Sequence, residues 1–247
     1  MLTLLRQEIY KQIHGKFYIG WGITMLIVSL IAGYVMSVTN RTAGIGQTEI
    51  VFSLGRSLIM FAMIAFSSTI MIGDFANNTV KYLFSRQFSR LQIFISKLIV
   101  MVIMLVYLYV LNYLFTYISK LIFLSNSSYK FKPMLSEMFS SMWFILLLIP
   151  MVILISNIAK NTGVAVAFGI VFYFAAGVIS NYLTLLIQKV EIIKWNPLNF
   201  LNIDSQFSYH GMKAMTHLSL TTMEIGTVVY ALIFTAIAYV IYNHRNV

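Results

Sequence analysis

The stretch GDFANNTVKYLFSRQFSRLQIFISK, residues 73–97, decides how the rest of the chain is interpreted. It carries four basic residues and one acidic residue, and it joins two long apolar runs, residues 50–72 and 93–118. Each run exceeds the roughly 20 residues that a helix needs to cross a bilayer core of about 30 Å. The sequence therefore predicts two transmembrane helices joined by a short polar loop.

The composition of the whole chain is typical of a membrane protein. The 247 residues are 60% hydrophobic and only 10% charged, and the mean hydropathy is +0.84. Soluble domains carry about 25% charged residues, so the charges here are too few to cover a water-facing surface. The apolar runs are continuous rather than alternating, which favours helices over a β-barrel. We therefore predict an all-α membrane protein.

Six apolar runs have the length of a transmembrane helix. They cover residues 18–38, 50–72, 93–118, 138–158, 164–187 and 225–242. No soluble domain interrupts them, so we expect residues 1–247 to form a single transmembrane domain. Charged residues precede the first run and no small-residue cleavage site follows it, which indicates an anchor rather than a removed signal peptide.

Two further segments are predicted to be helical without spanning. In residues 1–17, Leu2, Leu5, Ile9 and Ile13 recur at helical spacing, which predicts an amphipathic helix on the membrane surface. Residues 188–224 are too polar to span but rich in aromatic side chains. We expect this second segment to form short helices at the outer face that dip into the bilayer.

Basic residues near the span ends predict the orientation. Residues 1–17 carry three Lys or Arg residues and the loop after the second span carries three more, whereas Arg41 alone follows the first span. This asymmetry places both termini and the loop in the cytoplasm. The formal net charge of +10 is then explained by membrane-flanking loops rather than by nucleic-acid binding.

Several classes of active site have no support in the sequence. The chain has no cysteine, which excludes disulfides and thiolate chemistry. It has no G-x-x-x-x-G-K-[ST] motif to hold ATP phosphates and no catalytic signature. The four histidines are scattered, so no metal site is expected. We predict no catalytic residue and no cofactor on this chain.

Polar or small residues inside the spans are candidates for function or for helix packing. Arg56 lies at membrane depth, where a charge is costly; it can snorkel outward, pair with Glu49, or contact a substrate. Asn112, Gly169 and Gly177 can line a translocation path or a dimer seam, and the alternative for each is ordinary helix packing. Lys97 is expected to be an anchor at the inner interface.

Two helix starts carry the residues of a capping box. Ser89 and Gln92 give S-x-x-Q before the third span, and Thr221 and Glu224 give T-x-x-E before the sixth, with Thr221 as the predicted N-cap. In the loop between the second and third spans, residues 79–85 can form a short helix with Phe84 on its apolar side. The simpler interpretation is a basic loop that follows the positive-inside rule.

The loop resembles the one after the second span in ABC type-2 exporter permeases. The matching residues are Asp74, Thr79, Val80, Lys81, Leu83, Phe84, Ser85, Ser89, Arg90 and Lys97. Asp74, Asn78 and Gln87 stand where the family pattern has Glu, Gly and Pro. The layout of the chain is also similar, with an amphipathic N-terminal helix, six spans and a long segment containing Asn196-Pro197 before the last span.

The resemblance implies a permease domain over residues 1–247, with residues 73–92 as a coupling loop for a separate ATPase. The residues implied in ATPase coupling are Asp74, Asn78, Thr79, Leu83, Phe84, Arg86, Ser89 and Arg90. It further implies two ATPase subunits, a second permease chain that is identical or homologous, and a bacterial plasma membrane. The small size resembles the branch that exports peptides, bacteriocins or lantibiotics for immunity.

Two other functions remain open at this point. One is a self-contained channel or secondary carrier, and the other is a membrane-embedded immunity protein that transports nothing. A channel or carrier needs polar residues along a midplane path, for which only Arg56 and Asn112 are candidates. Co-purification of an ATPase would separate the exporter from both alternatives.

Overall fold

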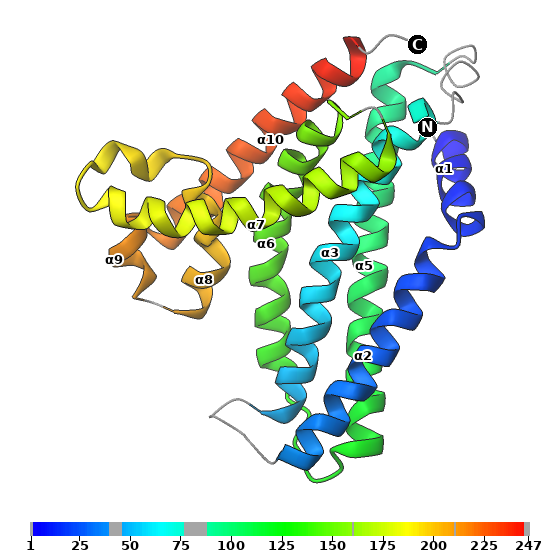
Figure 1. Ribbon diagram of the computed structural model, residues 1–247, viewed down its shortest axis with the longest axis vertical. Helices are drawn as coiled ribbons and strands as arrows, with labels where there is room; N and C mark the ends of the chain where they lie inside the picture. The colour runs from blue at the N-terminus through cyan, green and yellow to red at the C-terminus, as the bar shows by residue number, and fades with distance from the viewer. Residues whose placement is uncertain (1, 40–45, 77–87, 160, 210, 245–247) are drawn as a thin grey trace. The chain divides into compact units, whose positions relative to one another are not determined.

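The computed structural model describes residues 2–39, 46–76, 88–159, 161–209 and 211–244 (Figure 1). Within these ranges the regular structure is helical, with no strand. Six helices are long and apolar enough to cross a membrane. They are α2 (Phe17–Thr39), α3 (Gln47–Ala76), α5 (Arg90–Phe123), α6 (Phe131–Ser156), α7 (Thr162–Ile187) and α10 (Leu220–His244). The predicted fold class, an all-α membrane protein with six spans, is confirmed.

The chain divides into two compact units, and α3, α5 and α6 contribute residues to both. Unit 1 comprises residues 1–63 and 95–138, and unit 2 comprises residues 64–94 and 139–247. The expectation of a single permease domain stays a prediction.

The N-terminal segment forms α1 (Leu2–His14), which confirms the predicted helix. Leu4 and Glu8 are its buried residues, whereas Leu2 and Ile13 of the apolar stripe are exposed. Glu8 has an ionic partner inside unit 1, described below. The placement of the apolar stripe on the membrane surface stays a prediction.

Glycines in unit 1 let polar side chains of α5 reach the backbone of neighbouring helices. Asn112 Nδ2 donates to the Phe52 carbonyl of α3 at 3.0 Å, beside Gly55. A Cβ at Gly55 would lie 1.8 Å from Asn112 Oδ1, so a larger residue would exclude the amide. These small residues allow close approach and satisfy polar groups without water.

Residues 188–219, called here the connecting segment, join α7 to α10 in unit 2. They hold η1 (Glu191–Trp195), η2 (Asn199–Asn202), α8 (Ile203–Ser208) and α9 (Met212–Thr216), drawn in yellow to orange in Figure 1. Asn196 Oδ1 accepts from the Leu198 N–H at 2.9 Å, in the turn that leads to η2. The prediction of short helices is confirmed; their position at the outer face stays a prediction.

Phe200 fastens the connecting segment to the core of unit 2. Its side chain is fully buried with Ile203 and Met223, and its ring packs on Tyr230 at a centroid distance of 5.1 Å. A Cβ at Gly226 of α10 would lie 2.0 Å from this ring. The glycine therefore leaves the space that Phe200 fills, and burial of such an aromatic ring contributes a large part of local stability.

The start of α10 differs from the prediction. The Thr222 N–H donates to Ser219 Oγ at 3.1 Å, so Ser219, not Thr221, caps the helix. Ser219 lies directly before the first helical residue, Leu220, where its hydroxyl reaches the unpaired N–H groups of the first turn. The T-x-x-E spacing was a wrong signal here, because Thr221 is already helical.

Buried amides hold the connecting segment in one conformation. Asn199 is fully buried and its Nδ2 donates to the carbonyls of Lys194 at 2.9 Å and Thr216 at 3.2 Å. The Thr216 hydroxyl donates in turn to Gln206 Oε1 at 2.9 Å, and Gln206 Nε2 donates to the Leu218 carbonyl at 2.9 Å. The side chains thus satisfy carbonyls that these short helices leave unpaired.

We expect Asn199→Ala to destabilise the protein by about 1–3 kcal/mol, because the buried Thr216 carbonyl and the partly buried Lys194 carbonyl both lose their donor. The measurement is the thermal unfolding midpoint in detergent. Ser208→Ala is the matched control, since the exposed Ser208 hydroxyl donates only to the Asp204 carbonyl within its own helix. An unchanged midpoint for Asn199→Ala would contradict a structural role of the amide network.

Candidate functional site

The start of α5 has the capping box that the sequence predicts. The Ser89 N–H donates to Gln92 Oε1 at 3.1 Å, and the Gln92 N–H donates to Ser89 Oγ at 3.2 Å. Both residues of the S-x-x-Q pattern therefore satisfy backbone donors at the helix start. The boundary between the polar loop and α5 lies at Ser89, as expected.

The middle of the predicted coupling loop lies outside the described residues. This applies to Asn78, Thr79, Leu83, Phe84 and Arg86. The structure does describe Asp74, which is 8% exposed in the last turn of α3, and Ser89 and Arg90 at the other end of the loop.

Both loop ends are held against the C-terminal end of α10 in unit 2. Phe75 of α3 and Phe94 of α5 pack on the ring of Tyr242, with centroid distances of 5.3 and 5.5 Å. Phe94 also contacts Tyr239 at 5.5 Å. Tyr242 is 1% exposed, so the rings form a closed cluster. Such aromatic contacts add to the stabilisation from burial alone.

Arg90 adds a polar contact at the same place. Its guanidinium donates to the Asn243 carbonyl in the last turn of α10. The last four carbonyls of a helix lack intrahelical donors, and a cation is favoured at this end of the helix dipole. Sequence reasoning assigned Arg90 to ATPase docking and did not find its partner, because nothing local connects residues 90 and 243.

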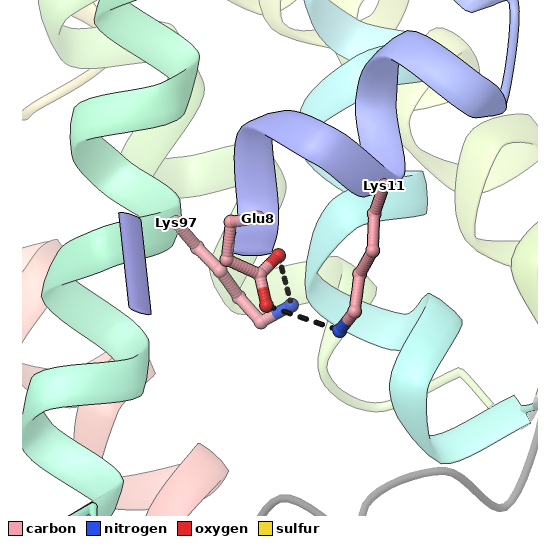
Figure 2. A network of polar contacts seen from close by, with 3 residues as sticks. All are labelled: Glu8, Lys11 and Lys97. Atoms are coloured by element: carbon pink, nitrogen blue, oxygen red, sulfur yellow. Dashed lines mark hydrogen bonds and ion pairs between the residues drawn. The ribbon is translucent and has the colours of Figure 1, made fainter. Parts of the chain in front are cut away.

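Lys97 lies in a buried ion pair of unit 1. Its Nζ is 3.4 Å from Glu8 Oε2, and both side chains are 1% exposed. Lys11 Nζ lies 3.1 Å from Glu8 Oε1, so one carboxylate bridges two ammonium groups, as Figure 2 shows. The expected role of Lys97 as an anchor at the inner interface stays a prediction; the structure adds a partner that was not expected, because the ammonium is buried against α1.

This ion pair joins α1 to α5. Only Leu4 and Glu8 are buried among the residues of α1, so the carboxylate is a large part of what holds this helix. Removing charges from water costs several kcal/mol, and only close opposite charges offset that cost. The pair therefore favours one docked position of α1, the position in which Glu8 meets Lys97.

Three of the four path or seam candidates have intramolecular contacts. Arg56 Nε lies 3.0 Å from Glu137 Oε1 of α6, so the proposed pairing with Glu49 is wrong. Glu49 instead accepts from the Gly46 N–H at 3.4 Å, at the start of its own helix.

The Asn112 side chain donates to a carbonyl of α3, as described above, and a Cβ at Gly169 would lie 2.8 Å from Ile64 of α3.

Gly177 differs from the other three candidates, because a Cβ there would meet nothing within 4 Å. A role of these four residues in a path or a seam stays a prediction. Among the residues that the structure describes, no group of three or more His, Cys, Asp or Glu side chains could hold a metal ion.

We expect Glu8→Leu and Lys97→Met each to lower the free energy of unfolding by about 3–5 kcal/mol, since each leaves a buried charge without this partner. The double variant should lose less than the sum of the single losses, because no unpaired member of the pair remains. Chemical unfolding in detergent micelles measures all three variants.

The matched control is the ion pair of the same residue types in η1, Lys194 and Glu191, whose charged atoms are 2.6 Å apart. The hydrogen bond from Lys194 lowers the pKa of the Glu191 carboxyl, but this carboxylate is exposed. Glu191→Leu and Lys194→Met should change stability little. Equal effects at the two pairs would contradict the role of burial at Glu8.

Comparison with known proteins places these elements in a family. The model of the family described as ABC-2 family transporter protein matches residues 4–177, from α1 into α7. A search of curated proteins finds no match to the chain. The matched range includes Glu8, Lys97 and the capped start of α5, and it covers more than half of the sequence. The chain is a multi-pass membrane protein that belongs to the ABC-2 transporter family.

Proposed function

We propose that this chain is the transmembrane subunit of an ATP-driven exporter that moves a hydrophobic or amphipathic substrate out of a bacterial plasma membrane. The substrate class is a peptide, an antimicrobial compound or a lipid-like molecule. Members of the family generally pair with an ABC ATPase. The sequence has no motif for ATP phosphates, which supports hydrolysis on a separate subunit.

The observation that carries the proposal is the anchoring of both loop ends on α10. Phe75 and Phe94 flank the polar loop and share Tyr242 as a partner. A load applied to the loop is therefore transmitted to α3, α5 and α10 together instead of bending one loop end. This arrangement suits a loop that receives a push from an ATPase.

Within unit 1, the ion pair of Glu8 links α1 to α5. Movement of this part of α5 along its axis displaces Lys97 and with it the docked α1. In the proposed transporter, α1 is thus a moving part on the cytoplasmic side rather than a passive anchor.

The first test is whether ATP hydrolysis co-purifies with the chain. An affinity-tagged chain, purified in mild detergent from its native membranes, should bring down an ATPase subunit and its activity. We expect Phe84→Asp combined with Arg86→Glu to lose at least tenfold of this activity, because an acidic loop no longer fits the ATPase. Arg90 is left unchanged, since its contact with α10 is structural.

The matched control makes the same changes in the connecting segment, Tyr209→Asp with Lys213→Glu, where both side chains are exposed. This variant should keep the ATPase bound. Retained activity in the loop variant would overturn docking through residues 77–87. A wild-type chain that carries no ATP hydrolysis but conducts substrate would instead indicate a channel or secondary carrier.

The proposed orientation predicts which positions react with a membrane-impermeant maleimide in intact cells. Because the chain has no cysteine, each single-cysteine variant has one reactive site. Ser125→Cys and Lys213→Cys should react from outside, whereas Thr3→Cys should react only after permeabilisation. All three positions are exposed, so accessibility across the membrane decides the result. Labelling of Thr3→Cys in intact cells would reverse the orientation.

A further inference from the structure

A cavity of about 370 Å³ lies in unit 2 beside Gly177, at the junction of α6, α7 and the connecting segment. Its apolar wall includes Phe144, Tyr173 and Phe174. The Phe144 and Tyr173 rings meet edge to face at 6.2 Å, and Tyr173 and Phe174 at 5.3 Å. The volume is within the range of about 300–1,000 Å³ that is typical of small-ligand sites.

Four polar side chains also line the cavity. They are Ser180 and Asn181 of α7, Asn202 of η2 and Ser205 of α8. Ser180 Oγ donates to the Leu198 carbonyl at 2.8 Å, and Asn202 Nδ2 donates to Asn199 Oδ1 at 3.4 Å. These two side chains therefore serve the fold, and their contacts keep the polar wall in place.

The side chains of Asn181 and Ser205 differ from those of Ser180 and Asn202, because they do not hold the fold through hydrogen bonds. Within the part of the chain that the structure describes, the side chains of both residues are exposed and make no hydrogen bond. Asn181 lies in a helix apolar enough to span a membrane, where an unsatisfied amide is costly. A ligand that pairs with this amide would remove the cost.

The chemistry of the wall selects the class of ligand. None of the ten residues that line the cavity in the described chain is charged, so an ionic headgroup has no counter-charge there. The Asn181 amide both donates and accepts hydrogen bonds, which matches the N–H and C=O of a peptide group. The ester group of a neutral lipid has hydrogen-bond acceptors but no donor. A phospholipid phosphate would find no cationic side chain among the residues that line the cavity.

We propose that this cavity binds a short, uncharged, apolar peptide segment. An apolar side chain of the peptide packs on Phe144, Tyr173 and Phe174, and its backbone amides bond to Asn181 and Ser205. The inference rests on the proposed function in taking a peptide as the transported substrate. It goes further by assigning where and through which groups that substrate is held.

Gly177 provides a way to fill the cavity. A Cβ at this position would meet no atom within 4 Å, so the side chain of Gly177→Leu begins in open space at the cavity wall. Gly20 of α2 is the matched control, because a Cβ there also meets nothing within 4 Å and the residue lies in unit 1. Replacing glycine by leucine favours the helix at both positions.

The experiment follows the reactivity of a single cysteine, Val178→Cys, which lies on the cavity wall. The purified chain in nanodiscs reacts with N-ethylmaleimide in the presence and absence of the capped dipeptide acetyl-Phe-Leu-amide. We expect the peptide to slow the reaction at least threefold. Gly177→Leu should abolish this protection and Gly20→Leu should keep it.

A second variant tests the same site if Gly177→Leu does not fold. Asn181→Leu removes one hydrogen-bonding group that the fold does not use, and it should raise the peptide concentration for half protection by roughly three- to tenfold. Protection that survives both Gly177→Leu and Asn181→Leu would overturn the site.

Three further outcomes also overturn the proposed peptide site. The peptide gives no protection, a monoacylglycerol protects equally well, or labelling slows as the concentration of the chain itself rises, with or without the peptide. The last outcome would make the cavity an interface between copies. The assay needs no ATPase, so its failure leaves the exporter proposal standing. Loss of the ATPase in the co-purification test would likewise leave a positive binding result intact.

Discussion

A hydrocarbon interior contains no water to satisfy a polar group, and this constraint explains most of the specific contacts in the molecule. In unit 1, Asn112 donates to a carbonyl of α3 and Ser119 Oγ donates to the Ser29 carbonyl of α2 at 2.9 Å. In unit 2, Asn157 Nδ2 donates to the Ala238 carbonyl of α10 at 3.1 Å. Each bond ties one long helix to another, so polar groups that would be costly alone determine which helices pack together.

Charged side chains are subject to the same lack of water, and leaving one unpaired costs more free energy than leaving a neutral polar group unpaired. Glu8 and Lys97 are buried to the same extent, and their separation of 3.4 Å allows each to offset the desolvation of the other. Arg56 and Glu137 are partly exposed, so water shares in stabilising them. The first pair therefore specifies the docking of α1, while the second tolerates more freedom between α3 and α6.

The sequence predicts what depends on neighbouring residues. Continuous apolar runs located all six spans, and the S-x-x-Q pattern located the start of α5, because both signals are local. The partners of Lys97, Arg56 and Arg90 lie 89, 81 and 153 residues away, and no local pattern encodes such pairs. The N-cap of α10 was missed for another reason: Ser219 and Thr221 are both good caps, and tertiary packing decides where the helix begins.

The candidate site, which is the polar loop with its two ends, could likewise be predicted only from local sequence patterns. Its location between the second and third spans follows from polarity alone, whereas the clamp formed by Phe75, Phe94 and Tyr242 required the fold. Apolar residues at span ends are common, and nothing in their sequence context distinguishes those that meet across helices. The cavity beside Gly177 was likewise hidden, because a glycine in a span has the same appearance whether it packs against a helix or borders open space.

The two ends of α10 are occupied by different parts of unit 2. Gly226 near its start receives the ring of Phe200, and Tyr242 near its end receives Phe75 and Phe94. The two positions are 16 residues apart in sequence, which corresponds to about 24 Å of helix. A bulkier residue at position 226 would displace the Phe200 ring, so the size of this residue limits how closely the connecting segment can pack on the helix that also carries Tyr242.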